Sequence, residues 1–216
     1  MEKKKASSQG NLSSNSPFTE DLLPLKSHTM IITYLGNSVN EYMNDFLPKL
    51  NITKFSCPYC DNQHLVSHDS YRRRLRCDED IYWFDIARVL CNRCGKTHAI
   101  LPDFIAPYRH FDAPHINKTI EMVIEGKATI DTASGSQESS TTKRWVQRFL
   151  GDWTDISGML QSILIELKKE YLSLLNSPTI WQAFLATLDA FPPTNDTSSI
   201  GQANKWLLNF QTQIWI

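Results

Sequence analysis

Two Cys-x-x-Cys pairs limit the possible folds of this chain more than any other part of its sequence. Cys57 and Cys60 form the first pair, Cys91 and Cys94 form the second, and the 30 residues 61–90 separate them. A Cys-x-x-Cys turn places two sulfurs at two corners of a tetrahedron, about 2.3 Å from a bound Zn²⁺. Two such turns complete a four-sulfur site, and a β-hairpin can occupy the segment between them. We therefore predict a small zinc ribbon with a structural zinc ion, while iron in the same cage remains an alternative.

A further cysteine and a histidine leave alternatives open around this site. Buried or redox-active thiols are the competing interpretation of the two pairs, although paired cysteines in a reducing compartment point first to metal. Cys77 is expected to be a small buried side chain or a spare thiol. His98 could replace a ligand or form a hydrogen bond with a sulfur, and a supporting structural role is the preferred interpretation. Four thiolates leave no open position for water, so the site is expected to be structural rather than catalytic.

Composition and net charge limit the classes of partner that this chain can have. The chain has 216 residues, 41% of them hydrophobic, which is enough for one or two small domains with real cores. Its formal net charge of -1 gives no overall attraction to nucleic acid, so any DNA contact must come from a local patch. The sequence shows neither a signal-like N-terminal segment nor a long apolar run. A cytoplasmic protein without a membrane span is therefore expected.

The pattern along the chain predicts an α+β fold that is mostly α-helical. Strand-like segments at 70–77 and 81–90 flank an acidic turn between the cysteine pairs, whereas apolar residues after Asp112 recur at helical spacing. Five regions follow: a disordered tail at 1–20, a strand and helix at 21–53, the zinc ribbon at 54–111, a helix-turn-helix-like domain at 112–153, and a C-terminal helical region at 154–216.

Three short helices are expected within residues 112–153. Asp112 can cap the first helix and Gly126 can end it. The second segment covers 129–137 and the third covers 139–153. Three short helices in so few residues are typical of a helix-turn-helix domain. The helices expected beyond it are 155–177, 181–191 and 199–215.

Basic and polar residues at two places are candidates for contacts with DNA. A recognition helix needs short polar and basic side chains near its N-terminus and an apolar back. On the third segment, the candidates are Ser140, Thr141, Lys143, Arg144, Gln147 and Arg148. On the hairpin they are Arg72, Arg73, Arg74 and Arg76, with Tyr71 as a stacking neighbour. The alternative is that these side chains are simply solvated, or neutralised locally by the acidic residues at 78–80.

The motifs CPYC at 57–60, YRRRLR at 71–76 and CNRCGKTHAILPDFIAPYRHF at 91–111 precede this helical material. Their order resembles that of an uncharacterised bacterial zinc-ribbon family found in and beside insertion-sequence transposases, over about residues 54–153. The resemblance implies a four-cysteine ribbon followed by a DNA-binding helix-turn-helix, with residues 140–145 at the start of the recognition helix. Gln137 and Thr142 stand where such families usually have apolar residues.

Catalysis is not expected. A transposase of this kind needs carboxylates on an RNase H-like α/β scaffold, and the residues after 153 are expected to be helical. We predict a non-catalytic protein that binds double-stranded DNA without a small-molecule substrate, as an accessory, regulatory or shortened transposase-like factor. Its C-terminal helices could pair two copies. The alternative is a zinc-stabilised protein–protein interaction module, favoured by the aromatic residues of these helices, Trp181, Phe184, Trp206, Phe210 and Trp215.

Overall fold

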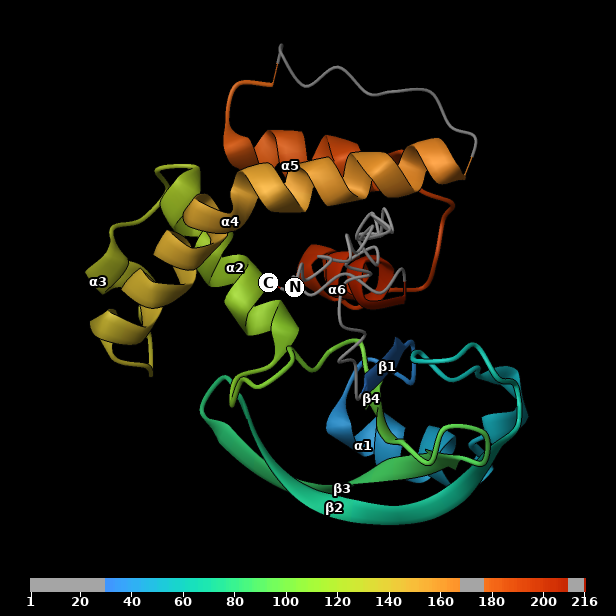
Figure 1. Cartoon of the computed structure of the whole chain (residues 1–216). Coiled ribbons are helices and arrows are strands. Elements are labelled where there is room, and N and C mark those ends of the chain that lie inside the picture. Colours follow the sequence, from blue (N-terminus) through green and yellow to red (C-terminus); the bar gives the residue numbers. More distant parts are fainter. Residues whose placement is uncertain (1–29, 168–176, 210–215) are drawn as a thin grey trace, which may run out of the picture.

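A four-stranded sheet forms one half of the molecule. The computed structural model describes residues 30–167, 177–209 and 216, so the tail expected at 1–20 lies outside the described residues. The strands are β1 (Met30–Thr33), β2 (Leu65–Cys77), β3 (Asp80–Cys91) and β4 (Thr97–Pro102), in the order β1-β4-β3-β2. With the helices that follow, the fold is α+β, as expected (Figure 1).

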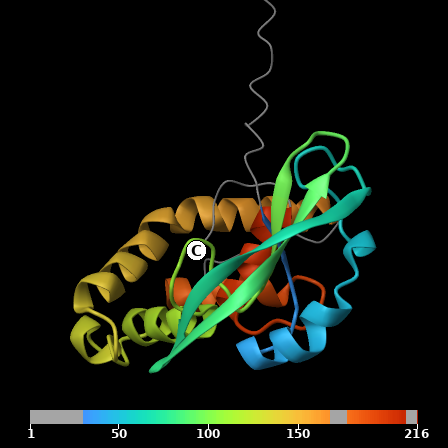
Figure 2. The same ribbon diagram turned by 90° about the horizontal axis from the view of Figure 1, so that it is seen from below.

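The hairpin between the cysteine pairs is longer than the pattern predicts. β2 and β3 pair antiparallel until Cys77 faces Asp80, so Asp78 and Glu79 alone form the turn. Asp78 adopts a φ of 51°, which the tight turn requires and which Asp tolerates better than most residues. The two long strands curve together across one side of the molecule (Figures 1 and 2). The predicted hairpin is therefore confirmed, with its tip at the acidic turn.

The N-terminal segment completes the sheet rather than standing apart. β1 pairs in parallel with β4, from Met30 opposite Ala99 to Thr33 opposite Pro102. After β1 come the short helix α1 (Val39–Glu41), a π-helical turn and two 3-10 turns, which reach residue 54. Tyr42 is fully buried there. The strand and helix expected in this segment are both present.

Five helices form the other half of the part of the chain that the structure describes. They are α2 (Ala113–Ile124), α3 (Ile130–Ala133), α4 (Ser139–Glu166), α5 (Ile180–Asp189) and α6 (Ser199–Asn209). The Asp112 side chain accepts a hydrogen bond from His115 N and caps α2, and Gly126 with a φ of 68° ends it, as the sequence predicts. No helix among the described residues is long and apolar enough to cross a membrane.

The prediction that a helix ends near Trp153 is wrong. α4 continues from Ser139 to Glu166, so the boundary expected between regions 112–153 and 154–216 falls inside one helix. Its yellow N-terminal part and orange C-terminal part run in different directions, so the helix bends (Figures 1 and 2). Gly151 lies midway along its sequence, where a glycine costs about 1 kcal/mol without breaking a helix. Buried residues on both sides, Phe149 and Ile156, keep the helix continuous by packing into one core.

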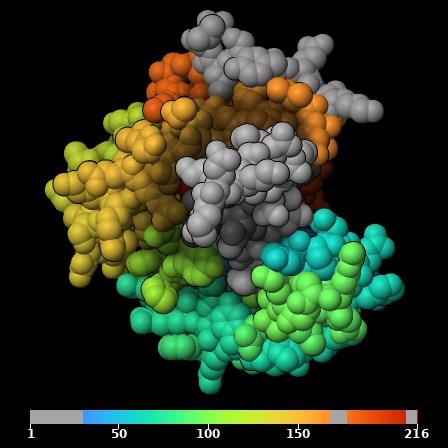
Figure 3. Space-filling view, viewed as in Figure 1, coloured from blue at the N-terminus to red at the C-terminus, as the bar shows by residue number. Residues whose placement is uncertain are grey.

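Each half has its own apolar core. The sheet core contains buried side chains of all four strands together with Tyr42 and Phe104. The helical core contains α2, α4, α5 and α6 and includes the aromatic residues Phe149, Trp181 and Phe184. The halves form two adjoining masses in the space-filling view, green and cyan below and yellow to orange above and to the left (Figure 3).

Candidate metal centre and basic surfaces

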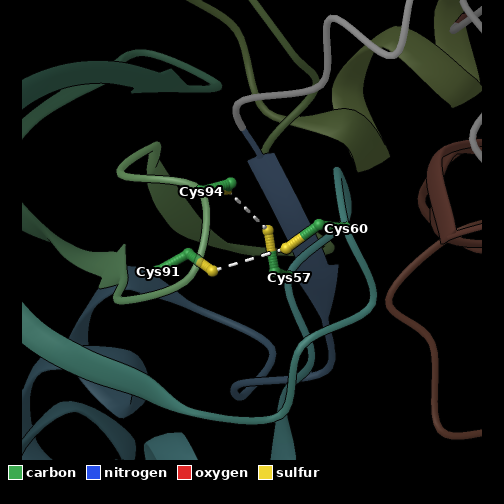
Figure 4. A group of neighbouring side chains, drawn as sticks. All are labelled: Cys57, Cys60, Cys91 and Cys94. Atoms are coloured by element: carbon green, nitrogen blue, oxygen red, sulfur yellow. Dashed lines mark hydrogen bonds between the residues drawn. The ribbon is translucent and has the colours of Figure 1, made fainter.

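The structure gathers the four predicted cysteines at one end of the sheet. Cys57 and Cys60 lie on the turn before β2, Cys91 ends β3, and Cys94 lies on the turn between β3 and β4. Their Sγ atoms all lie within 4.8 Å of one another (Figure 4). The hairpin returns the chain to its starting point, so the two pairs meet although 30 residues separate them.

The sulfur spacings fit a tetrahedral metal site. Cys57 Sγ lies 3.7 Å from Cys94 Sγ, and Cys60 Sγ lies 3.6 Å from Cys91 Sγ. A regular tetrahedron with metal–sulfur bonds of about 2.3 Å has sulfur–sulfur edges of about 3.8 Å. All four cysteines are free thiols. This donor set can hold a metal ion that prefers thiolates.

The two cysteine turns share one backbone geometry. Cys57 N donates to Asn62 O at 2.8 Å, and Cys91 N donates to Lys96 O at 2.9 Å, five residues on in each case. The residue four places after each of these cysteines has a left-handed backbone, with φ 57° at Asp61 and 70° at Gly95. The second turn uses the glycine that favours this conformation, and the first uses an aspartate.

Burial and hydrogen bonds shift the pKa values of two cysteine thiols in opposite directions. Burial raises the pKa of the Cys91 thiol, but donors from the Cys94 backbone, the Asn62 side chain and the Arg93 backbone outweigh it and hold this pKa at about 6. Burial dominates at Cys57 and raises its pKa to about 12.

His98 contacts one sulfur of the cysteine cluster from strand β4. It is fully buried on β4, and its Nε2 lies 3.1 Å from Cys57 Sγ. Of the roles left open for this histidine, the structure supports the hydrogen bond with a sulfur, because the four cysteines already fill a tetrahedron. Cys77 lies at the hairpin tip, outside the cysteine cluster, and burial raises the pKa of its thiol.

The polar and basic candidates on α4 share its outer face. Trp145, Val146 and Phe149 are buried on the inner face. The predicted DNA contacts Ser140, Lys143, Arg144, Gln147 and Arg148 are exposed, and Thr141 is half-buried.

The turn before α4 is built around buried polar side chains. Thr142 is fully buried, and its Oγ1 accepts hydrogen bonds from Ser134 Oγ and Gln137 Nε2, both at 3.0 Å. Gln137 Oε1 lies 2.8 Å from His115 Nε2 of α2. The residues that stand where apolar ones are usual, Gln137 and Thr142, therefore join α2, α3 and α4 through paired polar groups.

Strand alternation places Arg73 on the face opposite to Arg72 and Arg74, whereas Arg76 is half-buried near the hairpin tip. Arg73 Nη2 donates to the carbonyl oxygens of Ala106 and Arg109 at 3.0 and 2.9 Å. Arg76 lies over the Phe111 ring and donates to Ser136 O at 3.4 Å. Both guanidinium groups therefore make contacts within the protein, while the DNA contacts expected of all four arginines stay predictions.

The other face of the hairpin carries a residue that the sequence analysis missed. Arg72 and Arg74 are exposed there, and the Arg72 guanidinium lies 5.9 Å from the ring centre of Trp83, which is 57% exposed. Tyr71, expected as the stacking neighbour, is half-buried on the opposite face beneath Arg88. The alternation that places Tyr82 and Phe84 on the inner face assigns Trp83 to the outer one.

The fold and the cysteine cluster thus define a small α+β protein with a candidate four-thiolate metal centre. A family model described as a domain of unknown function (DUF6431) matches residues 57–145, less than half of the chain. This segment runs from the first cysteine of the cluster into the N-terminal part of α4. No curated protein and no solved structure matches the chain.

Proposed function

We propose that this protein is a non-catalytic, zinc-stabilised protein that binds double-stranded DNA. In this proposal α3 and α4 form a helix-turn-helix, and the N-terminal part of α4 enters the major groove. The observation that carries the proposal is the division of α4 into an exposed face of short polar and basic residues and a buried face of Trp145, Val146 and Phe149. Such a helix can reach base edges and phosphates while its back holds it on the protein.

The short helix and the turn support this assignment. α3 covers only Ile130–Ala133 and packs against both α2 and α4. The hydrogen bonds of Gln137 and Thr142 then fix the direction in which α4 leaves the turn. A recognition helix needs such a fixed direction, because base readout depends on placing a few side chains within the groove.

The hairpin offers a second contact surface near α4. Ser136 Oγ donates to Asp78 O at 3.2 Å, so the hairpin tip contacts the turn that precedes α4. The outer face of the hairpin carries the exposed side chains of Arg72, Arg74 and Trp83. In the proposal these arginines contact the phosphate backbone beside the groove.

Zinc has a structural role in this proposal. The Cys57, Cys60, Cys91 and Cys94 thiolates would hold the ion, and all four coordination positions would then be filled by protein. The ion would fix the base of the hairpin, whose tip contacts the turn before α4. The resemblance to transposase-associated zinc ribbons suggests that the DNA target lies at the ends of mobile elements.

A zinc-stabilised protein-interaction module is the second candidate. It is favoured by Ile81 and Trp83, which are 48% and 57% exposed on the hairpin. The aromatic residues expected to support it do so less well, because Trp181 and Phe184 are buried in the helical core. Trp206 packs against Phe191, and Phe210 and Trp215 lie outside the described residues.

An electrophoretic mobility shift at several salt concentrations tests the proposal on random and element-end duplexes. The double change Lys143→Ala with Arg144→Ala should weaken binding and lower the slope of log affinity against log salt by about two, because each lost phosphate contact removes about one unit. Lys49→Ala, at an exposed lysine on the sheet half, should leave both quantities unchanged. The DNA proposal fails if the unchanged protein does not bind duplex at low salt, or if the double change has no effect.

A further inference from the structure

One edge of the sheet is open along the middle of β2. This strand comes last in the order β1-β4-β3-β2 and lies at the outer margin of the molecule (Figure 1). Near the hairpin tip its free side is covered, because Arg76 N donates to His110 O at 2.6 Å and Arg76 O accepts from Asp112 N at 3.1 Å. Toward its start, the register shifts between Ser67 and Asp69. Between these points, no strand among the described residues lies beside residues 70–74.

The contacts of Arg76 show which backbone groups of β2 face this edge. A strand points the N–H and C=O groups of alternate residues toward the same neighbour. Arg76 points both groups away from β3, and the pairing from Asp69 to Cys77 is regular, so Ser70, Arg72 and Arg74 point theirs the same way. Within the described part of the chain, no backbone hydrogen bond reaches these three residues from the open side. The edge can therefore pair with a short added strand.

The side chains along this edge are positively charged. Arg72 and Arg74 are exposed on the outer face, and Arg73 is half-buried on the inner face. Among the described residues, none of these three arginines forms an ion pair. Their charges favour a partner that carries carboxylates. A second copy of β2 paired about Arg72 would instead bring two arginines face to face, which is destabilising.

A cavity on the inner face, next to this edge, offers room for a side chain. Tyr71 and Arg73 of β2 line it together with Arg88 of β3 and Tyr108 of the loop after β4, and its volume is about 320 Å³. On an added strand, a residue opposite Tyr71 or Arg73 would point to this inner face, whereas a residue opposite Arg72 would point to the outer face. The edge therefore fits a segment in which large side chains alternate with carboxylates.

We propose that residues 70–74 of β2 are a docking edge for an extended acidic segment of a partner protein, which adds a strand to the sheet. Main-chain hydrogen bonds with Ser70, Arg72 and Arg74 hold the segment, and its large side chains lie on the face of the cavity. The inference goes beyond the proposed function and does not depend on it. Arg72 and Arg74 contact phosphates in the proposed function, so the segment and the DNA backbone would exclude each other at the hairpin.

A fluorescently labelled peptide, Gly-Glu-Tyr-Glu-Tyr-Glu-Gly, tests the edge on the full-length, zinc-loaded protein by fluorescence anisotropy. The unchanged protein should bind this peptide. Arg72→Pro should weaken binding at least tenfold, because proline removes the N–H that faces the open side and leaves the hydrogen bonds with β3 in place. Arg72→Gln is the matched control, since it removes the same charge but keeps the N–H, and it should weaken binding less than Arg72→Pro does. Circular dichroism with zinc analysis verifies folding.

Peptides methylated on backbone nitrogens test strand pairing without a change in the protein, and they replace Arg72→Pro should that variant not fold. Only alternate groups of a strand face its neighbour, so methylation of one alternate set of nitrogens should abolish binding, while methylation of the other set should be tolerated. The docking edge is overturned if the two sets have equal effects, if the unmethylated peptide does not bind, or if Arg72→Pro binds it as the unchanged protein does.

Two further measurements separate the possible occupants and the two proposals. If sedimentation shows a dimer of the unchanged protein that Arg72→Pro dissociates, the edge belongs to a second copy and the acidic partner is lost. If the peptide binds but no duplex DNA does, the proposed function is lost and the docking edge stands. If duplex binding depends on Lys143 and Arg144 but the peptide does not bind, the docking edge is lost and the proposed function stands.

Discussion

The two halves of this protein are stabilised by different means. The sheet half buries Cys57 and Cys91 among its core residues, so its interior includes half of a candidate metal site. The helical half buries a cluster of aromatic rings, in which Phe149 lies 5.3 Å from Phe184 and 5.5 Å from Trp181 between ring centres. We therefore predict that the sheet half depends on a bound metal ion, whereas the helical half depends on burial of apolar area.

Removal of the metal ligands is expected to give the largest difference in stability between the two halves. Structural zinc sites contribute about 10–16 kcal/mol of folding free energy, and Cys91→Ser with Cys94→Ser removes two of four sulfurs. Hydrogen exchange followed by mass spectrometry should show that β2, β3 and β4 lose protection while α4 and α5 keep theirs.

Two checks accompany this experiment. Cys77→Ser, outside the cluster, should preserve both protection and one zinc per chain by metal analysis. Iron in place of zinc would correct the identity of the ion. Equal loss of protection in α4 and α5 would show that the two halves unfold as one unit.

The substitution Phe149→Ala is expected to lower the free energy of unfolding by a smaller amount, through the core of the helical half. The ring is 1% exposed, and a buried phenylalanine replaced by alanine costs about 3–5 kcal/mol. Chemical denaturation should record this loss with the metal still bound. Leu150→Ala is the matched control on the same helix, because Leu150 is 43% exposed and should cost less than about 1 kcal/mol. Similar losses for the two variants would contradict the aromatic core as the main support of this half.

The smallest effect concerns a carboxyl group that joins the halves. Asp103 follows β4, is buried, and accepts a hydrogen bond from Thr197 N at 3.0 Å, just before α6. Burial raises its pKa to about 6, and the charge of Asp196 adds to this against the opposing hydrogen bond from Thr197. The folded state therefore holds this proton more tightly than the unfolded state, so the contribution of Asp103 to stability falls as pH rises from about 4 to about 6.

The substitution Asp103→Asn should remove the loss of stability that ionisation of the Asp103 carboxyl causes as the pH rises. The free energy of unfolding at pH 7 is expected to rise by about 1–2 kcal/mol, less than the full shift because a charged hydrogen bond becomes neutral. Denaturation of both proteins between pH 5 and 7.5 measures the difference, which should shrink as the pH falls. Asp45→Asn, at an exposed position, should give the same pH profile as the unchanged protein. A constant difference across this range would contradict the pKa assigned to Asp103.

The parts of the molecule that could be predicted from the sequence are those set by local spacing. The cysteine pairs define turns of a few residues, and the acidic stretch at 78–80 marks the tip of the hairpin, so the cluster and the hairpin could be predicted, although the turn proved to be one residue shorter. The Asp112 cap and the Gly126 end of α2 are local in the same sense. The identity of the ion and the DNA contacts stay predictions.

The remaining features depend on contacts between distant residues. Met30 pairs with Ala99, and neither periodicity nor turn chemistry at Met30 indicates that partner. α4 continues past Gly151 because residues on both sides share one core, which outweighs the weak helix propensity of glycine. The inward direction of Arg73 depends on carbonyl oxygens in the loop at 106–109. A cluster of arginines in the sequence therefore does not reveal which side chains make contacts within the protein.

The parallel pairing of β1 with β4 has a consequence for the modularity of this chain. The segment that the family model describes, 57–145, includes β4 but excludes β1, and it stops before Val146 and Phe149. Excised at those limits, the segment would leave one edge of β4 unpaired and uncover Trp145, both of which promote aggregation. The unit that sequence comparison delimits is thus smaller than the unit that folds, and any transfer of this domain between proteins would need a strand and an apolar cover from its new host.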